Sequence, residues 1–254
     1  MIDINQGDCT LIRVGDNAMI IDAGNNGYGT QVRRYIEKLG IEKLDYVIGT
    51  HPDSDHIGGL DVVIYNFECG KIFMPDCSKD TKTYDDVIQI VKNKNYKITS
   101  PKVGETYKLG EAKFTIIAPL HYDYDDNYND CSISIMLEYG NNKFLFTGDC
   151  EEAAETDLIE SGYDLDADLF KAAHHGSNTA NTYEFLEAVT PKYCVISCGE
   201  GNTYHHPHAE VLNNLRAMQV KVFRTDEQGT VVAYSDGNNI TFNMSPSDTW
   251  KAGE

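Results

Sequence analysis

Short apolar runs bounded by polar or glycine-containing turns recur along the chain and predict β-strands. They alternate with longer segments whose apolar residues return every three or four positions, which is typical of amphipathic helices. The predicted strands are 1–4, 10–14, 18–22, 44–49, 71–74, 132–138, 143–147, 166–172 and 193–197, with a hairpin over 106–118 and a closing hairpin of 221–223 with 230–234 onward. The predicted helices are 30–39, 57–66, 84–92, 151–160, 182–189 and 209–218. This periodicity predicts an α/β sandwich.

The chain has 254 residues and contains no linker, repeat or low-complexity block, so we expect one domain over 1–244 and a frayed C-terminal tail over 245–254. No apolar run reaches about 18 residues, which predicts that this chain does not span a membrane. The seven cysteines are scattered and odd in number. This usage predicts free thiols in a reducing, cytoplasmic compartment.

The most informative polar segment directly follows the predicted strand 44–49. It places His51, Asp53, Asp55 and His56 within six residues, in a turn that precedes a predicted helix. Imidazole and carboxylate ligands together suit Zn²⁺, Mn²⁺ or Fe²⁺. The alternative is a solvated acidic turn that holds two histidines by chance. We interpret the segment as a metal site at the end of a strand.

Most of the other histidines also follow predicted strands, and His121 alone stands apart from a cluster. The further ligand-type residues at strand ends are His174 and His175, then His205, His206 and His208, and Asp149 in a Gly-Asp pair. Open α/β sheets bind their ligands at the carboxyl ends of strands. We therefore expect these residues to gather around one crevice.

The His-x-Asp-x-Asp-His pattern over 51–56 resembles the metal signature of the metallo-β-lactamase superfamily, with Asp53 where most members have a second histidine. In this feature the chain resembles the hydrolase domain of the ComEC competence family and its stand-alone relatives. Similar segments follow in family order: Asp-Ile-Asn-Gln-Gly-Asp at 3–8, Ile-Asp-Ala-Gly at 21–24, Thr-Gly-Asp at 147–149, Lys-Ala-Ala-His-His-Gly-Ser at 171–177 and His-Pro-His-Ala-Glu at 206–210. Asn5 stands where the family usually has glycine. The resemblance implies a four-layer αββα sandwich, metallo-β-lactamase-like.

The resemblance also implies two divalent metal ions, Zn²⁺ or Mn²⁺, with Fe²⁺ as a further candidate. The implied ligands are His51, Asp53 and Asp130 for one ion, Asp55, His56 and His175 for the other, and Asp149 as the bridge. Asp130 has two alternatives, a turn cap or replacement as ligand by Asn129. The choice of His175 over His174 follows the family pattern alone, and His206 is a further candidate. Asp22 is expected to brace the metal turn without binding metal.

A water held between two such metals loses a proton near neutral pH and becomes a metal-bound hydroxide, so no serine or cysteine nucleophile is needed. Donors for a phosphate or a leaving-group oxygen are expected near the ligands or at another strand end. These candidate catalytic residues are Lys171, His174, Ser177, His206 and His208. Lys171 has an alternative as a surface strand residue, and one of His206 and His208 has an alternative as a helix cap.

The charge balance argues against a long polyanionic partner. With 21 basic and 40 acidic residues the formal charge is −19, whereas a nucleic-acid binder carries a basic footprint. Acidity of this kind is also explained by solubility alone. The one net-positive stretch, 71–113, holds nine lysines and six acidic residues. It either borders the cleft or forms a solvated face.

We therefore expect a binuclear metal-dependent hydrolase, nuclease-like by resemblance, that acts as a phosphodiesterase on DNA or a nucleotide. Its substrate would be a small phosphodiester or single-stranded nucleic acid. One alternative is a hydrolase of another small ester, such as a phosphorylcholine ester or a lactone, because the superfamily supports both on one scaffold. The other alternative is a non-catalytic, metal-stabilised binding module. The full ligand set disfavours that module.

Overall fold

The computed structural model describes residues 1–125 and 127–253. Its strands are β1 Thr10–Val14, β2 Asn17–Ile21, β3 Lys43–Ile48, β4 Glu68–Phe73, β5 Ile98–Thr99, β6 Thr106–Leu109, β7 Ala112–Ala118, β8 Ser134–Tyr139, β9 Asn142–Phe146, β10 Leu169–Lys171, β11 Tyr193–Ile196, β12 Lys221–Arg224, β13 Ala233–Ser235 and β14 Ile240–Phe242. The first sheet has the order β1-β2-β3-β4-β5, and the second has the order β12-β11-β10-β9-β8-β7-β6. Both sheets are mixed, since each combines antiparallel with parallel neighbours.

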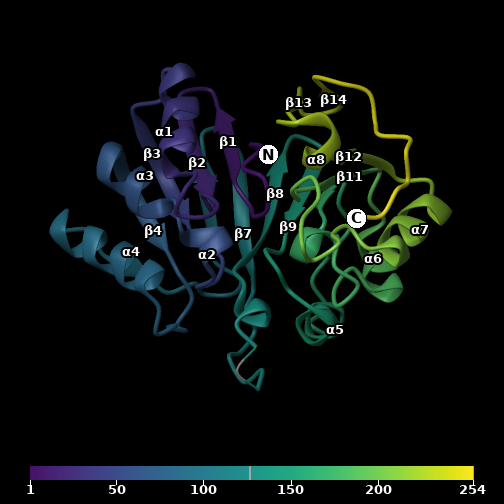
Figure 1. Ribbon diagram of the computed structural model, residues 1–254, viewed down its shortest axis with the longest axis horizontal. Coiled ribbons are helices and arrows are strands. Elements are labelled where there is room, and N and C mark those ends of the chain that lie inside the picture. The colour runs from purple at the N-terminus through teal and green to yellow at the C-terminus, as the bar shows by residue number, and fades with distance from the viewer. Residues whose placement is uncertain (126, 254) are drawn as a thin grey trace.

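The helices lie outside the two sheets. They are α1 Gly29–Lys38, α2 Ser54–Ile57, α3 Leu60–Asn66, α4 Lys82–Asn93, α5 Glu152–Glu160, α6 Tyr183–Val189, α7 Ala209–Ala217 and α8 Thr225–Gln228, with 3₁₀ turns at Asn129–Cys131 and Ala173–Gly176. Figure 1 shows α1, α3 and α4 on one side of the molecule and α5, α6 and α7 on the other, with the sheets between them. No helix among the described residues is long and apolar enough to cross a membrane.

Three clusters of buried apolar side chains fill the three interfaces between these layers. One packs α1 and α3 against the first sheet through residues such as Val32 and Leu60. A second lies between the sheets, where Met19 and Phe114 belong to opposite sheets. The third packs α5, α6 and α7 against the second sheet. The predicted αββα sandwich is therefore confirmed.

The helix predicted over 57–66 is interrupted at two glycines that pack closely against a neighbouring backbone. It divides into α2 and α3 on either side of Gly58 and Gly59. A Cβ atom on Gly58 would lie 2.4 Å from the backbone nitrogen of Asn26, and one on Gly59 would lie 2.3 Å from the carbonyl oxygen of Ala23. Glycine is required at both positions, and the close contact fixes the metal turn against the segment after β2.

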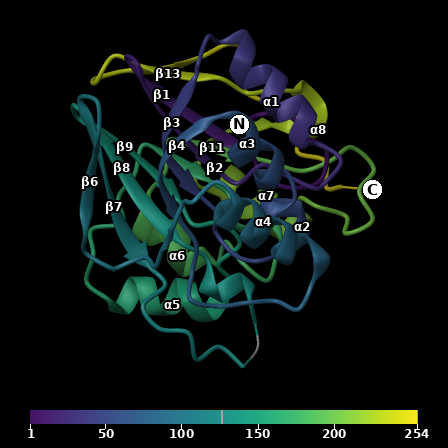
Figure 2. The ribbon, with the colours of Figure 1, turned by 90° about the vertical axis from the view of Figure 1, so that its left-hand side faces the viewer.

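The predicted closing hairpin of 221–223 with 230–234 is wrong. β12 pairs in parallel with β11 at the edge of the second sheet, and the short helix α8 leads the chain away from it. The hairpin that closes the fold is β13 with β14. Figures 1 and 2 both show β13 and α1 at one end of the molecule and α5 at the other.

Two terminal segments also differ from expectation. Residues 1–4 form no strand, although Ile2 donates a backbone hydrogen bond to Cys9. The tail 245–253 has no regular structure, but it is held against the domain. Trp250 packs on the apolar cluster beneath α7, and Gly253 donates a backbone hydrogen bond to the carbonyl of Pro207. The described part of the tail is therefore bound rather than frayed.

A buried carboxylate holds the start of α6. Glu155 on α5 accepts hydrogen bonds from the backbone N–H of Asn181 at 2.6 Å and from the N–H and hydroxyl of Thr182 at 2.9 and 2.8 Å. Burial raises the pKa of Glu155 to about 7, even though these hydrogen bonds favour the ionised form. The ionised carboxylate is therefore costly to bury above neutral pH.

We predict that Glu155 lowers stability as pH rises. Its folded pKa of about 7 lies above the usual 4.5, so the folded state holds an extra proton between these values. Its contribution to stability is complete below about pH 4 and is lost as pH rises through the folded pKa. The Glu155→Gln variant does not titrate here. When unfolding by urea is measured at pH 5 and at pH 8, the stability of the wild type relative to this variant should be about 2.5 kcal/mol lower at pH 8. Equal differences at the two pH values would contradict this assignment.

Candidate metal centre

Four buried side chains converge between the ends of the strands, and we call them the acid–histidine cluster. Asp8, His56, Asp149 and His175 each offer one ligand-type atom, and these atoms all lie within 4.8 Å of one another. Asp8 precedes β1, His56 lies on α2, Asp149 follows β9, and His175 lies in the turn after β10. Ligand-type residues from different strand ends therefore do gather at one point, and both halves of the fold contribute to it.

Unpartnered polar atoms gather at this point. Among the described residues, most of the buried side-chain atoms without a hydrogen-bond partner belong to the cluster or to its neighbour His51. They are Asp8 Oδ1, His51 Nε2, His56 Nε2, Asp149 Oδ1 and His175 Nε2. Buried polar atoms normally have hydrogen-bond partners, so several unpartnered atoms in one place are typical of a ligand-binding site. Imidazole nitrogens and carboxylate oxygens fit a divalent transition metal.

Contacts inside the cluster are close. His56 Nε2 lies 3.1 Å and His175 Nε2 lies 3.4 Å from Asp149 Oδ2, so Asp149 stands between the two histidines. His175 Nε2 also lies 3.3 Å from Asp55 Oδ2, and its Nδ1 lies 3.3 Å from Asp8 Oδ1. The structure thus brings Asp55, His56, Asp149 and His175 together, as the sequence predicted, and adds Asp8.

The other two residues of the metal turn differ from each other. His51 is buried, with its ring centroid 4.1 Å from that of His56. Burial and the neighbouring His56 lower the pKa of His51 to about 4, so its imidazole is neutral and able to ligate. Asp53 is partly exposed, and its carboxylate pairs with Lys79 at 2.7 Å. His51 therefore faces the cluster with a free nitrogen, whereas Asp53 is engaged by an ammonium group.

Opposite charges compensate one another within the site. Burial alone would lower the pKa of His56, but Asp149 and Asp22 raise it well above the ordinary value. Burial would raise the pKa of Asp149, but His56 and His175 hold it well below the usual range. Lys171 is buried as well, and its ammonium contacts Asp8 and lies 3.6 Å from Asp149 Oδ1. The alternative of Lys171 as a surface residue therefore does not apply.

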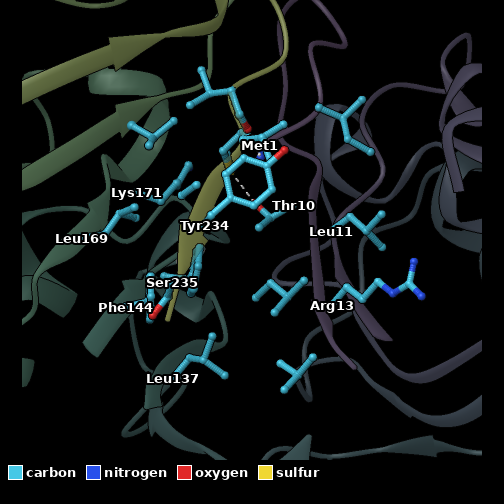
Figure 3. A pocket seen from close by; sticks show the side chains of 18 of the residues that line it. Met1, Thr10, Leu11, Arg13, Leu137, Phe144, Leu169, Lys171, Tyr234 and Ser235 are labelled. Atoms are coloured by element: carbon cyan, nitrogen blue, oxygen red, sulfur yellow. Dashed lines mark hydrogen bonds between the residues drawn. The ribbon is translucent and has the colours of Figure 1, made fainter. Parts of the chain in front are cut away.

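A separate cavity of about 560 Å³ lies between β1 and the inner face of the second sheet. Figure 3 shows Leu11 of β1 on one side of it and Leu137 and Leu169 of the second sheet on the other. Its lining is largely apolar and includes Lys171, but none of the acid–histidine cluster. We therefore distinguish this cavity from the candidate metal centre.

Asp22 braces the metal turn, as expected from the sequence. Its two carboxylate oxygens accept hydrogen bonds from the backbone N–H of Thr50 at 2.8 Å and from the Thr50 hydroxyl at 2.7 Å. Oδ2 also lies 2.8 Å from Nδ1 of His56. This contact favours a proton on Nδ1 and leaves Nε2 of His56 directed at the cluster.

An amide side chain holds the turn that carries the other histidine. Asn181 accepts a hydrogen bond from the N–H of Ala173 at 2.9 Å and donates to the carbonyls of Ala173 and Ser177 at 2.9 and 3.1 Å. Within this turn His174 and His175 have φ values of 46° and 55°. A left-handed backbone conformation is unfavourable for histidine, and the hydrogen bonds of the buried Asn181 side chain offset this cost. His175 Nδ1 lies 2.8 Å from the carbonyl of Ser197, which orients its ring.

Asp130 lies outside the acid–histidine cluster. Its Oδ1 accepts a hydrogen bond from the N–H of Glu151 at 2.7 Å, and its Oδ2 accepts one from Asn127 at 2.8 Å. Both carboxylate oxygens are thus engaged outside the cluster, and the longer-range bond joins Asp130 to the residue before α5. Asn129 points its side-chain amide towards Glu151 at 3.4 Å. A ligand role for Asp130 stays a prediction.

The remaining catalytic candidates differ in their contacts with the cluster and with its neighbouring turns. His174 Nδ1 lies 2.9 Å from Glu151 Oε1, and its Nε2 lies 3.8 Å from Asp149 Oδ2. Ser177 pairs its hydroxyl with Thr179 at 2.9 Å, inside the turn. His208 occupies the N-cap position of α7 without capping it through its side chain, and its Nδ1 accepts a hydrogen bond from a backbone N–H at 2.9 Å.

His206 belongs to the wall of the site. It is buried, and its ring centroid lies 5.4 Å from that of His174 and 5.9 Å from that of His175. Burial and these neighbouring histidines lower the pKa of His206 to about 3, which keeps its imidazole neutral. The structure places His206 beside the cluster but not within its ligand group.

Sequence reasoning gave no metal role to Asp8. The signal was present, because this acid ends the 3–8 segment that resembles the ComEC family. Its position beside residues more than 40 positions away depends on how the segment before β1 crosses the crevice, where the N–H of Asp8 donates to the carbonyl of Asp55 at 3.0 Å. Asn5 has a φ of 60°, a left-handed conformation that asparagine tolerates better than most residues. The substitution of the usual glycine is therefore accommodated.

Two curated competence proteins are similar to this chain over most of its length. ComE operon protein 3 of Bacillus subtilis (strain 168) is 29% identical over 265 residues, which cover 97% of this chain and 34% of that protein. Competence protein ComA of Neisseria gonorrhoeae is 29% identical over 232 residues, which cover 90% of this chain and 31% of that protein. The chain therefore spans about a third of the length of these relatives.

The fold also matches a solved structure at low identity. CmlA, a diiron β-hydroxylase from Streptomyces venezuelae, aligns with a TM-score of 0.57 at 13% identity, over 90% of this chain and 51% of that chain. The likeness supports the architecture alone. The family model described as the metallo-beta-lactamase superfamily matches residues 2–76 and 96–200, which contain all four residues of the acid–histidine cluster. On this match and the αββα fold, the chain belongs to the metallo-beta-lactamase superfamily.

Proposed function

We propose that this protein is a binuclear metal-dependent hydrolase that cleaves a phosphodiester, with a nucleotide or single-stranded DNA as substrate. The supporting observation is that Asp8, His56, Asp149 and His175 offer ligand atoms within 4.8 Å of one another, and that each of these residues, like the neighbouring His51, has a buried atom without a hydrogen-bond partner. A structural zinc site is usually closed by four protein ligands, whereas a larger set of histidines and carboxylates suits a pair of catalytic ions. Superfamily membership supports metal-dependent hydrolysis in general. The substrate class is our inference.

In this proposal His56, His175 and Asp55 hold one ion, and Asp149 is shared with a second. Asp8 is an added candidate ligand for the first ion, since its Oδ1 lies near His175. His51 and Asp53 hold the second ion, which requires Lys79 to release Asp53. When bound, the ions would supply an activated water and neutralise negative charge on a phosphoryl oxygen.

Lys171 acts on the carboxylates rather than on the substrate. Its buried ammonium donates to the carbonyl of Gly148 at 3.1 Å and contacts Asp8 and Asp149. These carboxylates raise the pKa of Lys171 despite burial, so it stays charged. A fixed cation here keeps both acids ionised and in place, which is the form that binds metal.

The contacts of His174 with Glu151 and Asp149 support a role in moving a proton beside the acid–histidine cluster. Glu151 Oε1 lies 2.9 Å from its Nδ1, and hydrogen bonds from His174 and Thr179 lower the pKa of Glu151 to about 2. An ionised Glu151 favours a proton on Nδ1 of His174 and leaves Nε2 towards Asp149. In this role His174 would exchange a proton with the leaving-group oxygen.

We predict that Asp149→Ala and His56→Ala abolish hydrolysis of bis-p-nitrophenyl phosphate in the presence of Mn²⁺ or Zn²⁺. Each substitution removes a proposed ligand, whereas Asp22→Ala removes a brace and should cost about 10- to 100-fold. Folding should survive, as judged by circular dichroism, because a core of this size does not depend on metal.

The matched control is His121→Ala. His121 is partly exposed and pairs with Asp157 outside the cluster, so its loss should leave the rate unchanged. Full activity of Asp149→Ala under limiting metal would place the chemistry elsewhere. If the wild type hydrolysed neither bis-p-nitrophenyl phosphate nor another ester with Mn²⁺ or Zn²⁺, the result would favour the non-catalytic binding module.

We also predict that a small phosphodiester is cleaved at least as well per site as DNA. The formal charge of −19 opposes a polyanion, and the lysines of 71–113 are partly neutralised. Lys82, Lys102 and Lys113, for example, pair with acidic residues. Hydrolysis of the small ester should therefore change little between 50 and 200 mM salt, and DNA affinity without metal should be weak.

The contrary result would be a tight DNA complex of the metal-free protein. Binding through several phosphates weakens steeply with salt, so the slope identifies that mode. Loss of such a complex on changing Lys92, Lys94 and Lys97 to Glu would favour a nuclease that follows a long strand.

A further inference from the structure

A row of aromatic rings leads from the acid–histidine cluster to the surface. The ring of Tyr204 stacks on that of His206, with centroids 5.6 Å apart and planes inclined by 21°. The ring of His206 in turn stacks on that of His175, at 5.9 Å and 30°. His175 and His206 are buried, whereas Tyr204 is 62% exposed. The row thus ends in an exposed ring that is two ring spacings from a proposed metal ligand.

Tyr204 is held in this position by its own loop. Its backbone N–H donates to Asn202 Oδ1 at 3.2 Å, and the same oxygen accepts from the N–H of His206 at 3.0 Å. The loop is fastened to the segment before β1, because Gly199 donates its N–H to Gln6 Oε1 at 3.1 Å. An exposed tyrosine on a fastened loop loses little conformational entropy when a ligand covers it.

The outer face of Tyr204 has no partner of its own. In the described parts of the chain, His206 is the one ring that stacks on Tyr204, and no cation lies over it. Tyr65, which is similarly exposed, differs in this respect, because Lys94 lies over its ring at 5.7 Å. The free face of Tyr204 therefore offers a flat apolar surface at the exposed end of the row of rings.

We propose that Tyr204 is the specificity-determining residue of this site and stacks on the base of a nucleotide whose phosphodiester lies at the acid–histidine cluster. The inference rests on the proposed function. Stacking on an aromatic ring contributes about 1–3 kcal/mol per base and does not depend on a basic surface. It thus gives an acidic protein a means of holding a nucleotide that the charge balance otherwise disfavours.

A choline group is the competing occupant, because a quaternary ammonium is attracted to tyrosine rings and to an acidic protein. Recognition of such a cation uses a cage of several rings around it. Tyr204 presents one open face, with its ring partner behind it. A single flat platform suits a flat base better than a compact cation.

The test compares three chromogenic esters that share one leaving group: thymidine 5′-p-nitrophenyl phosphate, methyl p-nitrophenyl phosphate and p-nitrophenyl phosphorylcholine. The metal-loaded wild type is compared with Tyr204→Ala and Tyr204→Phe, and with Tyr65→Ala as a matched control. Tyr65 is 63% exposed on α3, away from the row of rings. A second readout, without turnover, is calorimetric binding of thymidine 5′-monophosphate and of methyl phosphate.

For Tyr204→Ala we expect KM for the thymidine ester and Kd for thymidine monophosphate to rise by about 5- to 150-fold. For the methyl compounds, KM and Kd of Tyr204→Ala should stay within about 2-fold of the wild type. All values for Tyr204→Phe should also stay within about 2-fold, since a phenyl ring stacks on a base as a tyrosine ring does. The same holds for Tyr65→Ala, because Tyr65 is remote from the row of rings. The ratio of KM values for the thymidine and methyl esters, and the ratio of Kd values for the two monophosphates, should not change with salt concentration.

An equal loss on all three esters, or no loss on any, would overturn the stacking role while leaving the phosphodiesterase in place. A loss confined to the phosphorylcholine ester would assign Tyr204 to a choline group instead. Absence of hydrolysis of every ester by the wild type would refute the proposed function. In that case, selective loss of thymidine monophosphate binding in Tyr204→Ala would still support stacking of Tyr204 on the base. Unchanged binding would overturn that role.

Discussion

Mutual neutralisation of buried charges is the constraint on which the rest of this structure depends. Asp8, His56, Asp149, Lys171 and His175 lie in the interior between the strand ends, where each ion loses hydration worth several kcal/mol. The two carboxylates share their charge among one ammonium and two imidazoles at short distances. Several ligand atoms nevertheless keep no hydrogen-bond partner. These unpartnered atoms mark the point at which a divalent cation would fit the cluster.

The surrounding scaffold serves to keep those atoms converged. Asp22, directly after β2, fixes Thr50 and the ring of His56, and Asn181, in the loop before α6, fixes the left-handed turn of His175. Each brace is buried and fully used, so neither turn relaxes without leaving polar groups unpaired. Because the two braces belong to different halves of the fold, the geometry of the site depends on how these halves pack together. The packing of the αββα layers thus determines the relative positions of the ligand atoms.

Local sequence patterns predicted the elements and most of the converging residues. Apolar runs followed by His51–His56, by Asp149 and by His174–His175 placed these residues at strand ends, and parallel pairing of β9 with β10 brings two of those ends together. Long-range features were not predictable in this way. The helix break at Gly58 results from a backbone contact with Asn26, the pairing of β12 with β11 results from sheet registry, and the position of Asp8 results from a chain crossing. Capping of α5 by Asp130 likewise depends on a partner 21 residues away.

The central claim is that the acid–histidine cluster and His51 together hold a pair of divalent ions. The most direct measurement is anomalous scattering from crystals of the protein loaded with Mn²⁺ or Zn²⁺. We expect two peaks per chain, both beside Asp149, one next to His56 and His175 and the other next to His51, with ligand distances of about 2.0–2.2 Å. Metal bound elsewhere, or an acid–histidine cluster that stays metal-free in saturating metal, would contradict it.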